Sequence, residues 1–130
     1  MSVMTSELTA LVDRYIAIWN EHDPESRRQL IAQTWADDAH YLDPLLEGRG
    51  PDGIDAMTAG LQAQFPGLRF RRTGELDVHH DRIRFTWDAT DSGAAEPSLA
   101  GVDFAVITGD GRLASITGFF DWMPDLSGGA

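Results

Sequence analysis

The sequence predicts an α+β domain in which a curved antiparallel sheet wraps around helices. Apolar residues recur at helical intervals in the first half of the chain and at every second position in the second half. Turn signals such as Pro66-Gly67 and Asp110-Gly111 separate the segments of the second half. Helices followed by a meander of strands is the order expected of an α+β domain.

Three helices are expected before residue 66. Ser6 is an available N-cap for residues 6–21, whose apolar face consists of Leu8, Leu11, Val12, Tyr15, Ile16 and Trp19. Asp23 and Pro24 suit the start of a second helix that ends near Asp37, with an apolar stripe of Leu30, Ile31, Thr34 and Trp35. A third helix is expected over residues 51–64, from the spacing of Ile54, Met57 and Leu61.

Strands are expected over residues 36–44, 68–80, 82–90, 98–107 and 112–123. The second and third of these put Leu68, Phe70, Leu76 and Val78, and Ile83, Phe85, Trp87 and Ala89, on one face each. The "HHDR" and "TGDGR" segments are then hairpin turns. The strand at 98–107 is apolar on both faces, and we therefore expect a second copy of the chain to cover its outer face, giving a homodimer.

Composition restricts the class of protein. A chain of 130 residues fits one domain, which we place at residues 1–124 with a loose tail at 125–130. Its 10 basic residues are all arginine, against 21 acidic ones, and the net charge of -11 repels nucleic acid and anionic lipid surfaces. The chain has no cysteine. We find neither a signal peptide nor an apolar run long enough to span a membrane, so we expect a cytoplasmic protein.

Three polar residues stand out as candidates for chemistry. Asp43 ends the short strand and precedes Pro44, and it is either the start of an Asx-turn or an acid on the inner face. Asp103 interrupts an apolar strand, where burial would raise its pKa and keep it neutral; the alternative is a structural acid bonded to backbone. Tyr15 lies one turn from Trp19, and its hydroxyl needs a partner if it is buried.

Together these three groups match the needs of proton abstraction beside a carbonyl. A carboxylate base removes the proton, and two hydrogen-bond donors stabilise the oxygen on which charge develops. A second histidine-based or metal-based chemistry is not indicated, because His22, His40, His79 and His80 lack the spacing of metal ligands.

The sequence resembles the NTF2-like superfamily, and within it the SnoaL-like and ketosteroid-isomerase-like proteins. "DRYIAIWN" is similar to the first helix of that family, "WADDAHYLDP" to its helix-to-strand junction, and "GVDFAVITGDGRLASITGFFD" to its closing hairpin. The resemblance spans essentially the whole chain. It implies a conical fold around a deep apolar pocket, a small hydrophobic ligand, no cofactor, no metal and a dimer.

The same resemblance assigns roles to individual residues. The general base of the isomerases falls on Asp43, their oxyanion tyrosine on Tyr15 and their neutral acid donor on Asp103; the use of a neutral carboxyl donor in ketosteroid isomerase is an established example. Substrate-binding positions fall on Trp19, Trp35, Tyr41, Trp87, Gly118, Phe120 and Trp122. Polyketide-cyclase members tend to carry a catalytic acid late in the last strand, where this chain has Gly118.

One arginine is ambiguous. Arg72 shares its parity with the inner residues Leu68 and Phe70, so it either enters the pocket to meet an acidic ligand or Asp43, or is turned outward by a β-bulge near Gly74.

Three functions remain open from the sequence. The first is a cofactor-independent isomerase, cyclase or lyase that works through an enolate, and the second is a non-catalytic pocket protein or dimeric interaction module. The third is water addition or removal, which requires a second polar group beside Asp43.

Overall fold

The computed structural model describes residues 2–122, which form three helices and six strands. The helices are α1 (Ser2–Asn20), α2 (Pro24–Thr34) and α3 (Gly50–Gln64). The strands are β1 (Trp35–Leu42), β2 (Glu47–Arg49), β3 (Arg69–His79), β4 (Arg82–Thr90), β5 (Leu99–Ile107) and β6 (Leu113–Trp122). The predicted domain end at residue 124 and the predicted tail at 125–130 lie outside the described residues.

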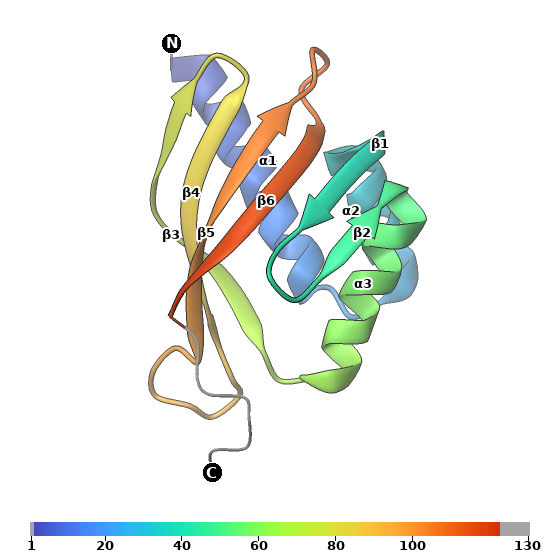
Figure 1. Cartoon of the computed structure of the whole chain (residues 1–130), viewed down its shortest axis with the longest axis vertical. Helices are drawn as coiled ribbons and strands as arrows, with labels where there is room; N and C mark the ends of the chain where they lie inside the picture. The colour runs from blue at the N-terminus through green and yellow to red at the C-terminus, as the bar shows by residue number, and fades with distance from the viewer. Residues whose placement is uncertain (1, 123–130) are drawn as a thin grey trace.

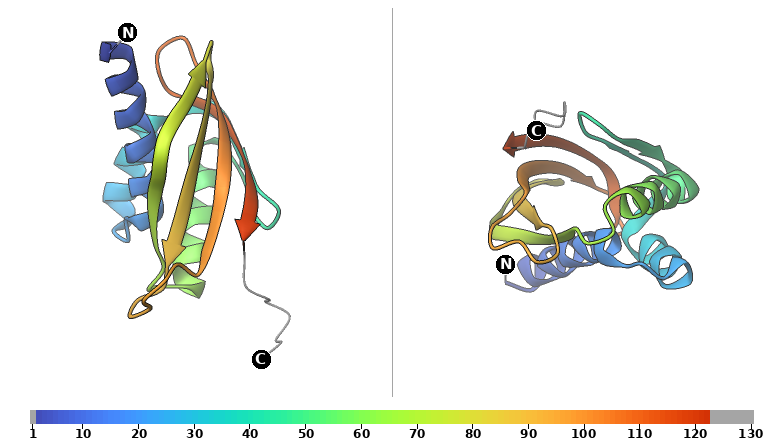
Figure 2. Two further views of the ribbon diagram at one scale, coloured as in Figure 1. Left: turned by 90° about the vertical axis from the view of Figure 1, so that its left-hand side faces the viewer. Right: turned by 90° about the horizontal axis from the view of Figure 1, so that it is seen from below.

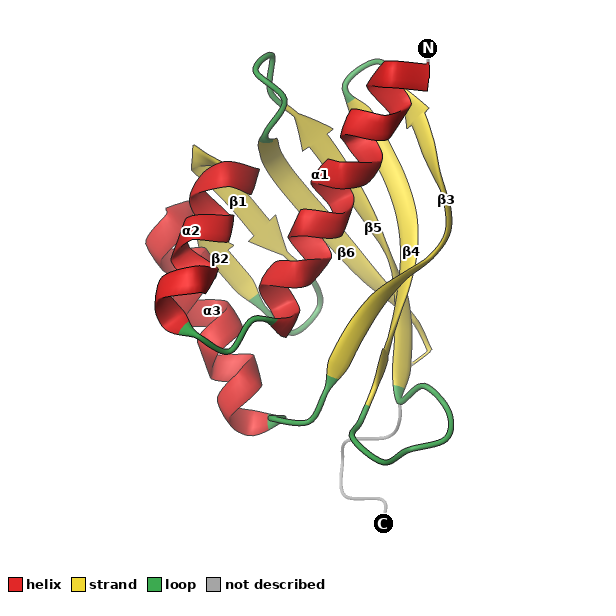
Figure 3. Ribbon diagram, turned by 180° about the vertical axis from the view of Figure 1, so that it is seen from behind, coloured by secondary structure: helices red, strands yellow, loops and turns green. Residues whose placement is uncertain are grey.

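The six strands form one sheet in the order β2-β1-β6-β5-β4-β3 (Figure 1). The sheet is strongly curved, and α1 lies across its concave face (Figures 2 and 3). The predicted antiparallel sheet is corrected in one respect, because β1 pairs with β6 in parallel and the sheet is therefore mixed. This pairing brings the segment after α2 beside the last strand of the chain.

Local signals explain most of the element boundaries. The side chain of Asp23 accepts a hydrogen bond from the backbone N–H of Ser26, as expected of an N-cap, and Pro24 occupies the first turn of α2. The predicted end of α2 near Asp37 is wrong, since the backbone becomes extended at Trp35 and β1 begins there. The first helix begins at Ser2, so Ser6 lies inside it rather than at its cap.

The three-residue strand β2 escaped prediction. It pairs with the end of β1 in an antiparallel hairpin, with Tyr41 opposite Gly48. A strand of three residues is too short to show an alternating pattern, and the glycine-rich segment around it reads as a loop. The hairpin matters for the site, because its connecting loop carries Asp43.

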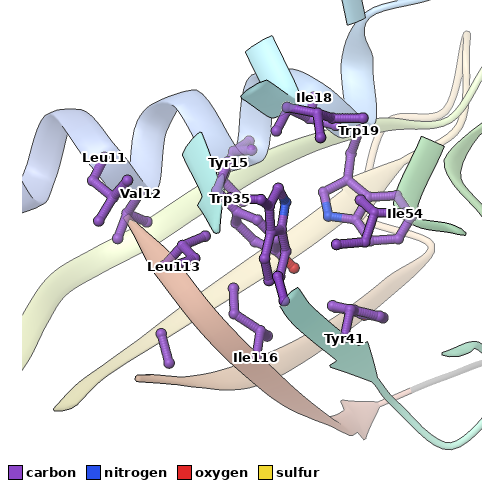
Figure 4. Packing of buried hydrophobic residues seen from close by; sticks show 14 of the residues in the cluster. Leu11, Val12, Tyr15, Ile18, Trp19, Trp35, Tyr41, Ile54, Leu113 and Ile116 are labelled. Atoms are coloured by element: carbon purple, nitrogen blue, oxygen red, sulfur yellow. The ribbon is translucent and has the colours of Figure 1, made fainter. Parts of the chain in front are cut away.

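The core fills the space between α1 and the sheet toward one end of the molecule. Its labelled members in Figure 4 lie on α1, β1, α3 and β6 and include Leu11, Val12, Ile18, Trp35, Leu113 and Ile116, all at most 1% exposed. Toward the other end the packing is open, and a cavity takes the place of the core.

The outer face of the sheet carries exposed aromatic side chains. Phe104 on β5 is 43% exposed and Phe119 on β6 is 53% exposed, with ring centroids 6.0 Å apart. This matches the expectation that the outer face of β5 is apolar, and pairing of two copies through it stays a prediction. Within residues 2–122 no helix combines the length and the apolar character that membrane crossing requires.

Candidate functional site

The cavity has a volume of about 560 Å³ and lies between the helices and the concave face of the sheet. Its wall is mostly aromatic and aliphatic and includes Ile16, Trp19, Phe70, Trp87, Leu99 and Phe120. Its exposed lining residues include Leu45 in the loop between β1 and β2, Phe65 at the end of α3 and Asp91 in the loop between β4 and β5, and these mark its mouth. A cavity of this size and lining suits a small apolar ligand.

Four polar side chains line the inner part of the cavity: Tyr15, Tyr41, Asp43 and Asp103. They come from α1, β1, the loop after β1 and β5, so only the folded chain brings them together. The hydroxyl of Tyr15 donates to Oδ2 of Asp103 at 2.8 Å, and the hydroxyl of Tyr41 donates to Oδ2 of Asp43 at 2.5 Å. The site therefore consists of two tyrosine–carboxyl pairs.

Asp103 is buried, with 2% of its surface exposed. Tyr15 bonds one carboxyl oxygen, and Nε1 of Trp87 donates to the other at 3.1 Å. Burial raises the pKa of Asp103 to about 7; the hydrogen bonds from Tyr15 and Trp87 lower it, and the charge of Asp43 raises it. Its carboxyl group is therefore partly protonated near neutral pH.

This raised pKa predicts a pH-dependent stability. The unfolded chain releases the proton of Asp103 near pH 4, whereas the folded chain holds it to about pH 7. The contribution of Asp103 to the free energy of unfolding therefore falls as the pH rises through this window, by about 4 kcal/mol in all, and is constant above it. The side chain of Asp103→Asn is neutral at every pH. We therefore expect the free energy of unfolding of this variant, relative to that of the wild type, to rise by about 3 kcal/mol from pH 5 to pH 8.

Urea unfolding of both proteins across this range measures the gain. Because all other titrating groups are common to the two proteins, their contributions cancel in the difference. A difference that does not change with pH would mean that Asp103 is ionised throughout in the folded protein.

Asp43 has both of the roles that the sequence left open. Its Oδ1 accepts from the backbone N–H groups of Leu45 and Leu46, each at 2.8 Å, which is an Asx-type turn. Its Oδ2 faces Tyr41, and the residue is half-buried and lines the cavity. The turn holds the carboxyl group in place without removing it from the cavity.

Gly118 on β6 lies where the two pairs meet. A methyl group placed on its α-carbon would come 2.7 Å from Oδ1 of Asp103, 3.2 Å from Cβ of Asp43 and 3.6 Å from the hydroxyl of Tyr41. One added carbon would thus touch both carboxyl-bearing residues, which shows that they flank the same small space.

We expect Gly118→Ala to disrupt the site. The carboxyl group of Asp103 cannot withdraw without losing its bond to Trp87, so the variant should lose about 1–3 kcal/mol of stability. Gly60→Ala is the matched control, since a methyl group there meets nothing within 4 Å and removes a glycine from α3; it should leave stability unchanged or raise it by up to about 1 kcal/mol. Thermal unfolding of both variants checks the prediction, and equal midpoints would contradict it.

The predicted substrate-binding residues fall into two groups. Trp19, Tyr41, Trp87 and Phe120 line the cavity. Gly118 is not a lining residue itself, but a methyl group there would contact three residues that are. Trp35 does not line the cavity; it packs against Tyr15 from the core side, with ring centroids 5.9 Å apart. Trp122 is 53% exposed and also lies off the lining, because it is at the far end of β6.

Arg72 lies on the inner face of the sheet but does not line the cavity. The register of β3 and β4 shifts between Thr73 and Asp77, Gly74 has a φ of 69°, and Nε of Arg72 pairs with Asp13 on α1 at 3.0 Å. The bulge lies beyond Arg72, which is still opposite the cavity residue Trp87 and therefore on the inner face of the sheet, so neither alternative offered by the sequence holds: Arg72 faces inward but pairs with Asp13 and not with a group of the cavity. Among the described residues no group of histidine and acidic side chains is arranged to hold a metal ion.

Sequence reasoning missed the residues of the mouth. Leu45, Gln64, Phe65, Asp91 and Ser98 lie in loops or at a helix end, where no periodic pattern marks an inner face. Only the presence of polar residues in the turn between β4 and β5 was a signal, and such residues are common in turns.

Three helices and a curved six-stranded mixed sheet around a cavity define the NTF2-like, or cystatin-like, class of proteins. The chain belongs to the SnoaL-like domain family, whose model matches residues 12–116. No curated protein matches it significantly.

Solved structures agree with this family. A candidate isomerase of the SnoaL-like family from Agrobacterium tumefaciens str. C58 is 35% identical, with a TM-score of 0.85 over 90% of this chain and 99% of the other. A protein of unknown function with a cystatin-like fold from Nostoc punctiforme is 12% identical, with a TM-score of 0.74 over 95% and 96% of the two chains. A candidate SnoaL-like polyketide cyclase from Jannaschia sp. CCS1 is 17% identical, with a TM-score of 0.65 over 87% and 86%.

Proposed function

We propose that this protein is a cofactor-independent enzyme that transfers a proton on the carbon beside a carbonyl group of a small apolar molecule, as an isomerase does. The observation that carries the proposal is the arrangement around Gly118. There a half-buried carboxylate and a buried acid–phenol pair face the same space inside an apolar cavity.

Each of the three groups has a role in this reaction. Asp43 takes the proton from the carbon beside the carbonyl, the C–H electrons form the carbon–carbon double bond, and the carbonyl oxygen takes the negative charge. The oxygens of Tyr15 and Asp103 lie 2.8 Å apart. When a substrate oxygen enters, the Tyr15 hydroxyl turns its proton from Asp103 to that oxygen, and protonated Asp103 donates to the same oxygen. Asp43 then returns the proton to carbon, so that no cofactor is consumed.

Asp43 keeps the capacity to act as a base in spite of its partners. A carboxylate offers roughly four lone-pair positions. Leu45, Leu46 and Tyr41 use three of them, which leaves one for a proton. The three donors also orient the carboxyl group, and a fixed orientation favours transfer over a short distance.

The isomerase form of the proposal is favoured over a cyclase that depends on a late acid. The candidate isomerase from A. tumefaciens is the 35% identical structure, whereas the candidate cyclase from Jannaschia is 17% identical. The position at which cyclases tend to carry that acid holds Gly118, and an added side chain there would collide with Asp103.

Deuterium exchange tests the proposal without knowledge of the native substrate. We expect the protein to catalyse the entry of deuterium at the carbons beside the carbonyl of phenylcyclohexanone in deuterium oxide, as followed by proton NMR. The rate should fall above pH 7 as Asp103 ionises, because the ionised acid donates no proton to the substrate oxygen. Tight binding of the ketone without any exchange above the buffer rate would instead support the alternative of a non-catalytic binding protein.

A further inference from the structure

The charge lining the cavity is of one sign. Among the described residues the lining includes three acids, Asp43, Asp91 and Asp103, and no arginine, lysine or histidine. Neither Asp43 nor Asp91 has an arginine or histidine within salt-bridge distance in the described part of the chain. With a net charge of -11 on the chain, nothing local offsets the negative potential inside the cavity.

Arg72 is the one cation that sequence parity placed on the inner face. Its pairing with Asp13 directs it along α1, and its Nη1 donates to the backbone carbonyl of Gly74 at 2.6 Å. The ion pair with Asp13 and the bond to Gly74 therefore occupy the group that could have met an anionic ligand, and Arg72 does not line the cavity.

The polar residues of the lining lie at two ends. Tyr15, Tyr41, Asp43 and Asp103 occupy the inner end, while Gln64, Asp91 and Ser98 occupy the mouth, and aromatic and aliphatic side chains lie between them. Ser98 directly precedes β5 and lies five residues before Asp103, a span of roughly 16 Å at the rise of an extended strand. A ligand that satisfies both ends is elongated.

Asp91 is the charged group of the mouth, and its side chain can only accept hydrogen bonds when ionised. Asp91 is exposed and receives one bond, from the backbone N–H of Ser92 at 2.9 Å, which leaves most of its lone-pair positions open. The hydroxyl of Ser98 accepts from the backbone N–H of Asp91 at 3.3 Å, so the two residues are tied together across the loop. A hydroxyl or ammonium group on a ligand fits this end, whereas a carboxylate or phosphate is repelled by it.

We propose that the cavity selects an elongated apolar ligand without negative charge that ends, at the mouth, in a group donating a hydrogen bond to Asp91. The position of the reacting carbonyl at the inner end of the ligand rests on the proposed function. The discrimination against anions and the hydrogen-bond donor at the mouth do not rest on it. A ligand that places a carboxylate or phosphate at the mouth is thereby disfavoured.

The test uses four phenylcyclohexanones that differ only in the para substituent of the ring: hydrogen, hydroxyl, aminomethyl or carboxylate. With a hydrogen bond at each end, the substituted compounds suit the span of the cavity. Calorimetric titration is expected to show about three- to tenfold tighter binding of the hydroxyl and aminomethyl compounds than of the unsubstituted one. The carboxylate is expected to bind at least about tenfold more weakly.

Two variants locate the cause. Asp91→Asn should reduce the advantage of the aminomethyl compound to less than about twofold and relieve part of the penalty of the carboxylate. Glu96→Gln removes the same charge from the same loop at an exposed residue off the lining, and it should leave the order of affinities unchanged. Equal effects of the two variants would mean that net charge, and not Asp91, sets the order, and would overturn the proposal.

Other outcomes separate this proposal from the proposed function. The proposed selectivity is overturned if the carboxylate compound binds as tightly as the unsubstituted one. It is also overturned if neither the unsubstituted nor the hydroxyl compound binds. If the order of affinities holds while no deuterium enters any ketone, the selectivity stands and the catalytic proposal fails. If deuterium enters all four compounds and their affinities are equal, the catalytic proposal stands and the selectivity fails.

Discussion

Replacing Asp43 by asparagine is expected to slow deuterium exchange into phenylcyclohexanone by about 10²–10⁴-fold, the usual contribution of a general base. Asparagine has the shape of aspartate, and its side-chain oxygen can still accept from the backbone N–H groups of Leu45 and Leu46. The loop after β1 should therefore keep its conformation, and ketone binding should change by less than about threefold. Exchange rates by NMR and affinities by calorimetry measure the two effects separately.

Asp38→Asn is the matched control for this loss. Asp38 lies on β1, the strand that precedes the loop of Asp43; it is exposed and does not line the cavity, so the variant changes the net charge equally without touching the site. Its exchange rate should stay within about twofold of the wild type. An Asp43→Asn protein that retains more than a tenth of the activity would end the assignment of Asp43 as the base.

The largest effect on stability is expected for Asp55→Ala, at about 3–5 kcal/mol. Arg27 is 3% exposed, and its Nε donates to Oδ1 of Asp55 at 2.7 Å. Its Nη1 donates to the backbone carbonyl of Glu21 and to the side chain of Gln62. Loss of Asp55 leaves the buried guanidinium without its close buried carboxylate, and an unpaired buried charge is costly.

This cluster also supports the cavity. The side-chain amide of Gln62 donates to the backbone carbonyls of Trp19 and Glu21, so α3 holds the end of α1 that carries a wall residue. We therefore expect Asp55→Ala to bind ketones more weakly as well as to unfold more easily. Urea unfolding measures the loss of stability, and calorimetric titration measures the loss of affinity.

Two further variants isolate the ion pair. Asp52→Ala removes an exposed acid from the first turn of the same helix and should cost no more than about 1 kcal/mol. The double variant Arg27→Met with Asp55→Ala removes both charges and should be more stable than Asp55→Ala alone, because no buried charge is left unpaired. A double variant less stable than the single one would show that Arg27 contributes chiefly through its bonds to Glu21 and Gln62.

Much of the fold follows from local pattern. The 3.6-residue period of α1 and the two-residue period of β3 to β6 are properties of short segments, and the structure confirms these elements to within a few residues. The hairpin turns are equally local, with Gly111 at a φ of 84° and His80 at a φ of 52°. The short strand β2, the early end of α2 and the parallel pairing of β1 with β6 had no such local signal.

The candidate site likewise combines features that local sequence pattern predicts with features that only folding produces. Tyr15 and Asp103 were recognisable because each interrupts an apolar face with a polar group, and burial then demands a partner. Their mutual hydrogen bond joins residues 88 positions apart and is a result of folding. The partnership of Tyr41 with Asp43 depends on the turn after β1, and the direction of the Arg72 side chain depends on its ion pair with Asp13 of α1, neither of which shows in alternation alone.

The sequence by itself determined which residues face inward, because burial of apolar surface imposes a period on each helix and strand. It thereby determined the α+β class and named the base, the neutral acid and the phenol as candidates. Only the tertiary structure decided that these groups meet around Gly118, that the mouth carries Asp91 and that, within residues 2–122, no arginine or histidine lines the cavity. Those properties arise from pairing between distant strands and from loop conformation, which the period of a single segment does not encode.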